Sequence, residues 1–412
     1  MTRLWSDVVR TSISARRAQL RYAVAVVALI APASAQSQAF HPATAKTLGC
    51  SGWETKFKGS TAPSNSPIKS LGCDRYYIGD FNGDGVDEVL TVDGLTGSDS
   101  KMSVMRFNSS NNTWSNPPLW SVNGDPHDGG IYDYRANLVV GDFDGDNKDE
   151  VLGVAPGSSN AWITMFHFES NTWVFGWSNG GDESAGGGIY PYRNYLTAGH
   201  FDASDDRDYL LGGGGWVTMF RFDGTDFVWR WSTGTSHGML PYAFSKCYVG
   251  DLDADGQDDV IYVSSGGGPI TWATSFYWTG TDWFWGWSNG TTSGLLLDWP
   301  YPIGSDRLLV GNIDGDASHE MLFIQRNYNA TCSEAMQFPV GQGYLPPVHG
   351  WDNDQCYCPW FDTWKMSGGV GTLTDYYLMR TSPGAPKSLL ARREYEDDGY
   401  YAIGVINSIG AK

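Results

Sequence analysis

Positive charge is scarce in this sequence, and charged residues of either sign are few. The chain contains 27 lysines and arginines against 46 aspartates and glutamates, which gives a formal net charge of −19. A chain with this charge repels phosphates, so nucleic acid is excluded as a partner. Charged residues make up only 18% of the sequence, whereas aromatic residues make up 14%. This composition argues against a disordered chain and predicts a sizeable buried core.

A hydrophobic run long enough for a membrane helix is also missing. Such a helix needs about 20 apolar residues, and the N-terminal apolar run covers only residues 23–31. That run follows Arg16 and Arg17 and precedes Ala33-Ser34-Ala35, which is the arrangement of an export signal with a small-residue cleavage site. We expect residues 1–35 to be a signal peptide and residues 36–412 to be a single secreted domain without a transmembrane segment.

Motifs of common enzyme classes are lacking as well. The seven histidines are scattered, and neither an HExxH zinc helix nor a phosphate-binding loop occurs. The pattern G-x-S-x-G appears at residues 176–180 and 286–290, but a hydrolase serine needs a strand-to-helix turn. Here the pattern ends a β-prone run and recurs in a related form at residues 230–234. It therefore predicts a repeated turn, and no block of sequence is left for a separate catalytic domain.

Cysteines are few, and none forms a C-x-x-C pair with metal-binding spacing. The six are Cys50, Cys73, Cys247, Cys332, Cys356 and Cys358. An even number of cysteines in an exported chain favours disulfides over zinc. From proximity in the sequence we predict a bond between Cys50 and Cys73, and one from Cys332 to Cys356 or Cys358.

What the sequence does contain is an acidic loop that recurs between two apolar runs. The copies begin at residues 80, 142, 200, 251 and 312, so the steps between them are 62, 58, 51 and 61 residues. Three copies are complete, at residues 79–89, 141–151 and 250–260, and the copies at 199–209 and 311–321 keep the pattern less fully. The chain is therefore predicted to be a repeat protein.

Each repeat unit is predicted to contain four β-strands. Short β-prone runs stand directly before and after each loop, for example at residues 138–140 and 151–154. A third run follows at 162–168, and a fourth at 173–177 ends in a Trp-Ser turn. Four strands in a unit of this length are typical of one β-propeller blade. We expect an all-β propeller of six or seven four-stranded blades, seven favoured, in which residues 53–71 form part of a blade that closes the ring.

The chemistry of the loop follows from oxygen atoms at fixed positions. In the copy that begins at Asp80, side-chain oxygens stand at positions 1, 3, 5 and 9, and a glycine at position 6 allows a sharp turn. The backbone carbonyl at position 7 adds a further oxygen. Calcium prefers several oxygen ligands in a flexible geometry, whereas magnesium demands a stricter octahedron. The predicted calcium ligands of this copy are Asp80, Asn82, Asp84, Glu88 and the carbonyl of Val86.

Three further copies supply equivalent ligand sets. In two of them the carbonyl at position 7 belongs to Lys148 or Gln257. Asn147 replaces the glycine at position 6 of one copy, and asparagine tolerates the left-handed conformation needed there. The predicted ligands are Asp142, Asp144, Asp146, Lys148 and Glu150; Asp251, Asp253, Asp255, Gln257 and Asp259; and Asn312, Asp314, Asp316 and Glu320.

The copy that begins at His200 departs from this pattern. His200 and Ser204 replace two ligand positions, which leaves Asp202 and Asp208 as the acidic residues at predicted ligand positions. Acidic turns without a metal are the alternative for this copy and for the copy that begins at Asn312. Where a cation is bound, repetition of similar sites favours a structural ion that ties down a turn over a catalytic ion.

These loops are not EF-hands, because an EF-hand has a glutamate at position 12 between two helices, and here position 12 is threonine, glycine or tyrosine in a strand. The loops and their repetition resemble the FG-GAP family, the calcium-binding propeller repeats of integrin α chains and of many secreted proteins. The family pattern D-x-D-x-D-G-x-x-D maps onto the copies that begin at Asp80, Asp142 and Asp251. The resemblance covers residues 70–330 and implies a calcium-binding β-propeller.

A second repeated element precedes some of the loops. Residues 129–135 read Gly-Gly-Ile-Tyr-Asp-Tyr-Arg, and residues 187–193 read Gly-Gly-Ile-Tyr-Pro-Tyr-Arg. Aromatic faces beside an arginine and flexible glycines suit stacking on sugars with hydrogen bonds to hydroxyls. The alternative is that these rings pack between adjacent blades. The predicted ligand-binding residues are Tyr132, Tyr134, Arg135, Tyr190, Tyr192 and Arg193.

Two functions follow from these observations. The first is a secreted, calcium-stabilised binding module that recognises glycans or an extracellular protein surface, as a lectin or an adhesin does. The second is a carbohydrate-active enzyme on a propeller scaffold, either a polysaccharide lyase or a hydrolase. An active site would interrupt the repeat, and the least regular stretch is residues 327–364, with Asp352, Asp354 and Asp362.

Overall fold

The chain divides into two units, Met1–Lys46 and Thr47–Lys412, in the computed structural model. The structure describes residues 53–60, 75–93, 101–123, 130–135, 137–155, 162–181, 188–192, 195–213, 217–233, 247–265, 271–288, 308–313, 315, 317–326, 331–337, 348–352, 372–395 and 400–408. All of these residues belong to the second unit. The predicted signal peptide lies outside them.

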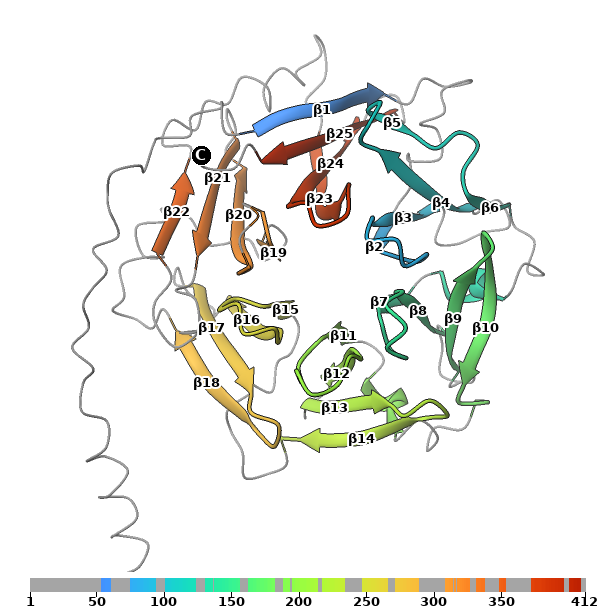
Figure 1. Cartoon of the computed structure of the whole chain (residues 1–412), viewed down its shortest axis with the longest axis vertical. Coiled ribbons are helices and arrows are strands. Elements are labelled where there is room, and N and C mark those ends of the chain that lie inside the picture. The colour runs from blue at the N-terminus through green and yellow to red at the C-terminus, as the bar shows by residue number, and fades with distance from the viewer. Residues whose placement is uncertain are drawn as a thin grey trace, which may run out of the picture. The chain divides into compact units, whose positions relative to one another are not determined.

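The described strands form six antiparallel sheets, which we number in chain order (Figure 1). The first sheet contains β2 (Arg75–Gly79), β3 (Glu88–Asp93) and β4 (Lys101–Asn108), with β5 (Thr113–Trp114) and β6 (Trp120–Asn123) both paired to β4. The second contains β7 (Leu138–Gly141), β8 (Glu150–Val154), β9 (Ile163–Glu169) and β10 (Thr172–Ser178). The third contains β11 (Leu196–Gly199), β12 (Tyr209–Gly213), β13 (Val217–Phe222) and β14 (Phe227–Ser232).

The other three sheets follow the same order along the chain. The fourth contains β15 (Cys247–Gly250), β16 (Asp259–Ser265), β17 (Thr271–Trp278) and β18 (Trp283–Ser288). The fifth contains β19 (Leu308–Gly311), β20 (Glu320–Arg326), β21 (Thr331–Gln337) and β22 (Val348–Asp352). The sixth contains β23 (Thr372–Arg380), β24 (Lys387–Tyr395), β25 (Tyr400–Ser408) and the N-terminal strand β1 (Trp53–Ser60). Two 3-10 helices, η4 (Ile131–Tyr134) and η6 (Tyr190–Tyr192), precede β7 and β11.

The sheets are arranged as a β-propeller, which confirms the predicted all-β class. Four of them consist of four consecutive strands, and the first strands of neighbouring sheets contact one another in the order β2, β7, β11, β15, β19, β23. β23 also contacts β2. The pairing of β1 with β25 places an N-terminal strand in the last sheet, as expected for a partial blade that closes the ring.

The hydrophobic core lies between neighbouring sheets. One cluster joins the first and second sheets, the next joins the second and third, another joins the third and fourth, and a smaller one joins the sixth to the first. Because both faces of the first three sheets are covered, their second and third strands are buried along almost their whole length, as in β8 and β9. This explains why these strands are apolar almost without interruption in the sequence.

An aromatic residue at the second position of three acidic loops packs against the next sheet. The ring centroid of Phe81 lies 5.2 Å from that of Trp173, Phe143 lies 5.7 Å from Phe227, and Phe201 lies 5.1 Å from Trp283, all edge to face. The three phenylalanines of the loops are fully buried. Each loop is therefore anchored on the fourth strand of the following sheet.

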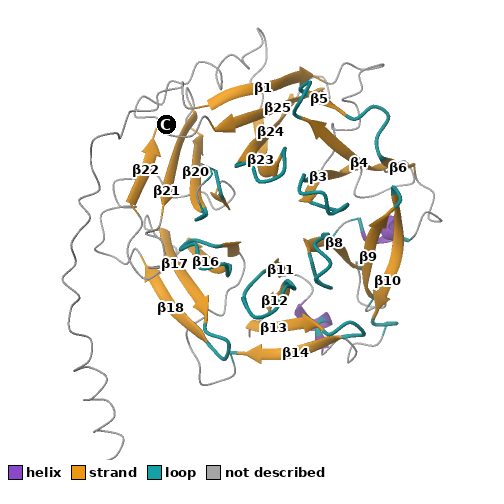
Figure 2. Cartoon of the chain, in the orientation of Figure 1, coloured by secondary structure: helices purple, strands orange, loops and turns teal. Residues whose placement is uncertain are grey.

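The acidic loops are the turns between the first and second strands of the sheets (teal in Figure 2). We call them loop 1 (residues 80–87), loop 2 (142–149), loop 3 (200–208), loop 4 (251–258) and loop 5 (312–319), and the matching turn of the sixth sheet is loop 6 (380–387). In loops 1, 2, 4 and 5, position 9 is then the first residue of the second strand. Loop 3 is one residue longer than the others.

Neighbouring loops are joined by a repeated pair of hydrogen bonds at position 8. The Asp149 backbone N–H donates to the Asp80 carbonyl (3.0 Å), and the Asp149 carboxylate accepts the Asp80 N–H (2.7 Å). The same exchange joins loop 3 to loop 2 through Asp208, and loop 4 to loop 3 through Asp258.

The series continues through the C-terminal sheets to the first sheet. His319 joins loop 5 to loop 4 in the same way, with its Nδ1 as the acceptor of the Asp251 N–H. The Lys387 N–H donates to the Asn312 carbonyl at 2.7 Å. Asp87 exchanges hydrogen bonds with Arg380, so loop 1 is joined to loop 6 across 293 residues of sequence. The bonds at position 8 therefore connect all six loops in one closed series.

Candidate metal centre

The carboxylate at position 1 shapes each complete loop. Asp80 accepts backbone N–H bonds from Gly83 (2.9 Å), Asp84 (3.0 Å) and Gly85 (2.7 Å). Gly85, at position 6, has a φ of 84°, so the predicted sharp turn at this position is confirmed. Asn147 takes the same left-handed conformation in loop 2, with a φ of 67°.

The carboxylates at positions 1, 3 and 5 converge in two of the loops. Within each group, one carboxylate oxygen per residue lies within 4.8 Å of the others. The two groups are Asp142, Asp144 and Asp146 in loop 2, and Asp251, Asp253 and Asp255 in loop 4. Each group could hold a metal ion, so the spacing in the sequence predicted this convergence correctly.

The acidic residue at position 9 is buried beneath the loop. Glu88, Glu150 and Asp259 expose 0%, 1% and 6% of their surface. Glu88 Oε2 and Asp259 Oδ2 have no hydrogen-bond partner among the described residues. A buried carboxylate oxygen without a partner is costly, and a cation in the loop would satisfy it.

Burial and crowding raise the pKa values of these carboxyl groups. Burial raises the pKa of Glu88 to about 8, of Glu150 to about 7 and of Asp251 to about 6. Burial also raises the pKa of Asp259 well above its ordinary value, and the charges of the other loop 4 carboxylates raise it further. Removal from water is therefore the main reason that these carboxyl groups are harder to ionise than exposed ones.

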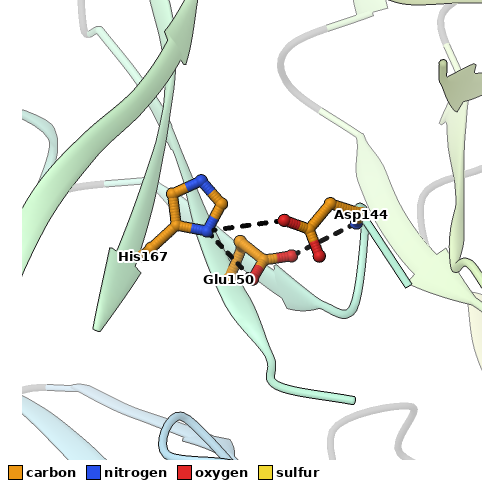
Figure 3. Close-up of side chains that lie close together, drawn as sticks. All are labelled: Asp144, Glu150 and His167. Carbon is orange, nitrogen blue, oxygen red and sulfur yellow. Dashed lines mark hydrogen bonds and ion pairs between the residues drawn. The ribbon is translucent and has the colours of Figure 1, made fainter. Parts of the chain in front are cut away.

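A histidine joins the carboxylates of loop 2, and sequence analysis did not find it. His167 on β9 places its Nδ1 3.2 Å from Glu150 Oε1 and 3.8 Å from Asp144 Oδ2 (Figure 3). The imidazole lies against Gly176 of β10, where a Cβ atom would come within 2.2 Å of its Nε2. The three side chains form a further group that could hold a metal ion. Only the pairing of β8 with β9 brings His167 to the loop, so loop spacing could not have revealed it.

An arginine occupies the equivalent place at loop 1. Arg106 on β4 is the ladder partner of Glu88. Its Nη1 lies 2.5 Å from Asp84 Oδ2 and 3.4 Å from Glu88 Oε1. Asn82 Nδ2 also donates to Glu88 Oε1 at 2.5 Å. Loop 1 therefore contains a positive charge between two of its predicted ligands.

The extra residue of loop 3 changes the roles of its acidic residues. Counting along the sequence placed Asp208 at position 9, and the structure corrects this. Asp208 accepts the Asp142 N–H at 3.0 Å and thus takes the role of position 8, while Tyr209 is the ladder partner of Gly199 and stands at position 9.

Two arginines pair with two of the remaining carboxylates of loop 3. Arg221 Nε lies 2.7 Å from Asp205 Oδ2, and Arg230 Nη2 lies 3.7 Å from Asp202 Oδ2. Loop 3 is thus held by ion pairs within the chain. This arrangement agrees with the alternative of an acidic turn without a metal.

The remaining predicted ligands are described only in part. In loop 5 the Ile313 N–H donates to Glu320 Oε2 at 2.7 Å, and Asp314 and Asp316 lie outside the described residues. The N–H groups of Lys148 and Gln257 donate to the carboxylates at position 5 of their loops. The role of the position 7 carbonyls as ligands stays a prediction.

The predicted ligand-binding tyrosines lie at the contacts between sheets. Tyr132 and Tyr190 are buried members of two interface clusters, and Tyr134 and Tyr192 pack against the same clusters. The Arg135 guanidinium lies 4.2 Å from the ring centroid of Tyr132. The packing alternative accounts for these positions. Arg193 lies outside the described residues.

The repeated Trp-Ser pairs are the last two residues of β10, β14 and β18, so they lie in strands rather than in the predicted turns. Thr164 Oγ1 donates to Ser178 Oγ at 3.2 Å, and the pairs Thr218–Ser232 and Thr274–Ser288 do the same in the next two sheets. A contact between strand partners that is repeated in three sheets supports a structural role of these serines over that of a nucleophile.

The cysteine predictions fall mostly outside the described residues. Cys50, Cys73, Cys356 and Cys358 are among the residues that the structure does not describe. Cys247 is a free thiol, and burial raises its pKa well above the ordinary value.

Exposed aromatic residues recur on the fourth strands of three consecutive sheets. Phe175 of β10, Trp229 of β14 and Trp285 of β18 expose 62%, 59% and 52% of their surface. They occupy the same place in the strands, two residues before a buried tryptophan. A register shift follows each exposed ring, which turns the buried tryptophan to the other face of the sheet.

Oxygen atoms dominate the donor set of the acidic loops. Carboxylates at fixed positions, buried oxygens without partners and left-handed turns are the features of a site for a hard divalent cation. The residues present in loops 2 and 4 fit such an ion. Loop 3 does not, because His200 and Ser204 replace two ligand positions and Asp202 and Asp205 already pair with arginines.

Comparisons with known proteins add no functional assignment. No protein-family model and no curated protein sequence matches the chain. Among the solved structures that are similar to this chain, rhamnogalacturonan lyase YesW is 15% identical, with 86% of this chain and 72% of that chain covered and a TM-score of 0.34. A putative 6-phosphogluconolactonase from Bacteroides fragilis is 12% identical, with 77% of this chain and 81% of that chain covered and a TM-score of 0.36. The Nup133 β-propeller domain from Vanderwaltozyma polyspora is 10% identical, with 86% of this chain and 100% of that chain covered and a TM-score of 0.33. Similarity at this level carries no argument about activity. Among the described residues, no helix is long and apolar enough to span a membrane.

Proposed function

We propose that this protein is a secreted β-propeller of the FG-GAP type that binds glycans, with calcium as a structural ion in its acidic loops. The observation that carries the binding function is the row of exposed rings formed by Phe175, Trp229 and Trp285. A large aromatic side chain left exposed at the same place in three consecutive sheets marks an interaction surface.

The separation of these rings favours a glycan over a protein partner. The three residues stand 54 and 56 positions apart in the sequence and on different sheets, so they are separate contact points rather than one continuous apolar patch. Single rings suit stacking on the C–H faces of sugars. Several weak sites on one rigid scaffold gain strength when the ligand repeats, as a polysaccharide does.

Calcium is the cation that best fits the loops. The donors are carboxylate and carbonyl oxygens on open turns, which suits the flexible geometry of calcium better than the strict octahedron that magnesium prefers. The order of the loops around the propeller gives these ions a structural role, because every loop is also a junction between two sheets.

Six blades are proposed for the propeller, although the sequence pattern favoured seven. The six described sheets support this number, since their first strands and the bonds at position 8 connect each sheet to the next and the sixth to the first.

Binding to polysaccharides tests the function. The full chain is applied to a glycan array and to polysaccharide affinity gels, with calcium and with a chelator. The triple variant Phe175→Ala, Trp229→Ala, Trp285→Ala is expected to lose binding without a change in melting temperature. The matched control is Trp162→Ala, which removes an exposed ring just before β9.

Three results would contradict the proposal. Binding that survives in the triple variant would place recognition elsewhere on the protein. Shortening of the polysaccharide during incubation would favour the enzymatic alternative, and capture of protein but no glycan would favour an adhesin.

A further inference from the structure

The acidic loops differ in the residue that faces position 9 from the neighbouring strand. In loop 1 this residue is Arg106, the ladder partner of Glu88. In the fourth sheet, Val260 pairs with Phe276, so the next residue, Tyr277, stands opposite Asp259. One site thus has a permanent positive charge beside its buried carboxylate, and the other has an aromatic ring.

The Arg106 side chain lies among the groups that a calcium ion would need. Its Nη1 contacts both Asp84 and Glu88, which are positions 5 and 9 of the predicted ligand set. A guanidinium stays protonated under all ordinary conditions. A divalent cation could bind these two carboxylates only after displacing Arg106, and it would still be repelled by the displaced charge.

Loop 4 differs from loop 1 in its balance of negative and positive charges. Its side-chain ligands are four carboxylates, against three carboxylates and one amide in loop 1. Asp251, Asp255 and Asp259 form no ion pair with a side chain of the described residues, and the buried Asp259 Oδ2 lacks a hydrogen-bond partner there. A buried oxygen without a hydrogen-bond partner therefore lies beside the acidic cluster. Calcium affinity rises with the number of charged ligands.

We infer that loop 4 is a tight calcium site of this protein and that loop 1 is closed to calcium by Arg106, which acts as a tethered cation. This inference rests on the proposed role of calcium and adds which loops use it. The residue opposite position 9 would then decide whether the carboxylates of a loop are neutralised by a calcium ion from solution or by a positively charged side chain.

Calcium titration of the full chain by calorimetry tests the inference. Asp251→Asn is expected to remove one tight binding equivalent, whereas Asp80→Asn, the same change in loop 1, leaves the tight equivalents unchanged. Tyr277→Arg is expected to weaken the tight site at least about tenfold, because it adds a positive charge beside the ion. Tyr277→Gln is the matched control without the charge.

A gain of binding provides the reciprocal test. Arg106→Gln is expected to create an additional calcium site, and Arg106→Lys, which keeps the charge, is not. A wild-type protein without any tight calcium would overturn both the inference and the proposed role of calcium. Tight binding that is lost in Asp80→Asn but kept in Asp251→Asn would overturn the inference alone, as would an unchanged stoichiometry in a folded Arg106→Gln variant.

Discussion

Two adjacent acidic residues at the end of loop 2 have separate tasks. Asp149, at position 8, accepts the Asp80 N–H at 2.7 Å and joins two sheets. Glu150, at position 9, turns to the same loop, where it meets His167 at 3.2 Å and the Phe143 N–H at 2.9 Å. Two adjacent positions of the chain therefore hold a group that joins two sheets and a predicted metal ligand.

Removal of the position 8 carboxylate tests its structural task. Asp149→Ala leaves the Asp80 N–H without its acceptor, so it is expected to lower the free energy of unfolding by about 1–3 kcal/mol. Asp149→Asn keeps an amide oxygen as the acceptor and is expected to cost less. Urea unfolding in chelator measures both, and equal losses in the two variants would contradict the assigned bond.

The raised pKa values of the position 9 residues make the metal-free protein sensitive to pH. Burial raises the pKa of Glu88 to about 8 and of Glu150 to about 7, so the folded chain takes up protons more readily than the unfolded chain. The corresponding stability is present below the ordinary carboxyl pKa of about 4 and is lost as pH rises through the folded values.

We therefore expect the melting temperature in chelator to fall as pH rises from about 5 to about 8. Calcium requires deprotonated carboxylates, so the stabilisation by calcium is expected to grow over the same interval. Melting curves with and without calcium at several pH values provide the measurement. A metal-free melting temperature that rises steadily over this interval would contradict the buried carboxyl assignment.

At the scale of elements, sequence patterns predicted the strands well. The loops were expected between two strands, and β7 (Leu138–Gly141) and β8 (Glu150–Val154) flank loop 2 as predicted. The third strands were expected from residues 162–168 and similar runs, and β9 (Ile163–Glu169) confirms one of them. Alternation and acidic spacing are local properties, which is why they could be recognised without a structure.

Contacts between elements were not predictable in the same way. His167 and Arg106 reach the loops through strand pairing, and the bond of Asp87 to Arg380 spans 293 residues. The extra residue of loop 3 also escaped prediction, because Asp208 fits position 9 by counting and position 8 by register. These features depend on register and on neighbouring sheets, which a single repeat does not encode.

The aromatic anchor between a loop and the next sheet can be tested by truncation. Phe143 is fully buried and packs 5.7 Å from Phe227, so Phe143→Ala is expected to lower the free energy of unfolding by about 3–5 kcal/mol. The matched control Phe175→Ala removes an exposed ring and is expected to change stability by no more than about 0.5 kcal/mol. Urea unfolding compares them, and a loss for Phe175→Ala as large as that for Phe143→Ala would show that its ring is packed.

At the scale of the whole molecule, the acidic loops and the pairing of the first strand with the last both hold distant parts of the chain together. β1 and β25 pair between the two ends of the chain, and the bonds at position 8 join each loop to its neighbour. A cation in a loop would stiffen a junction between sheets as well as a turn. This role would explain why the acidic pattern recurs with the sheets, and the proposed calcium ions would contribute to the stability of the whole propeller.

Thermal unfolding of the full chain in calcium and in chelator tests this central claim most directly. If calcium binds only the folded protein, an excess of about 100 times the dissociation constant adds about 2.7 kcal/mol of stability per site. The account predicts a clearly higher melting temperature in calcium, and a smaller difference for Asp251→Asn than for Asp80→Asn. The same melting temperature with calcium and with chelator would contradict it.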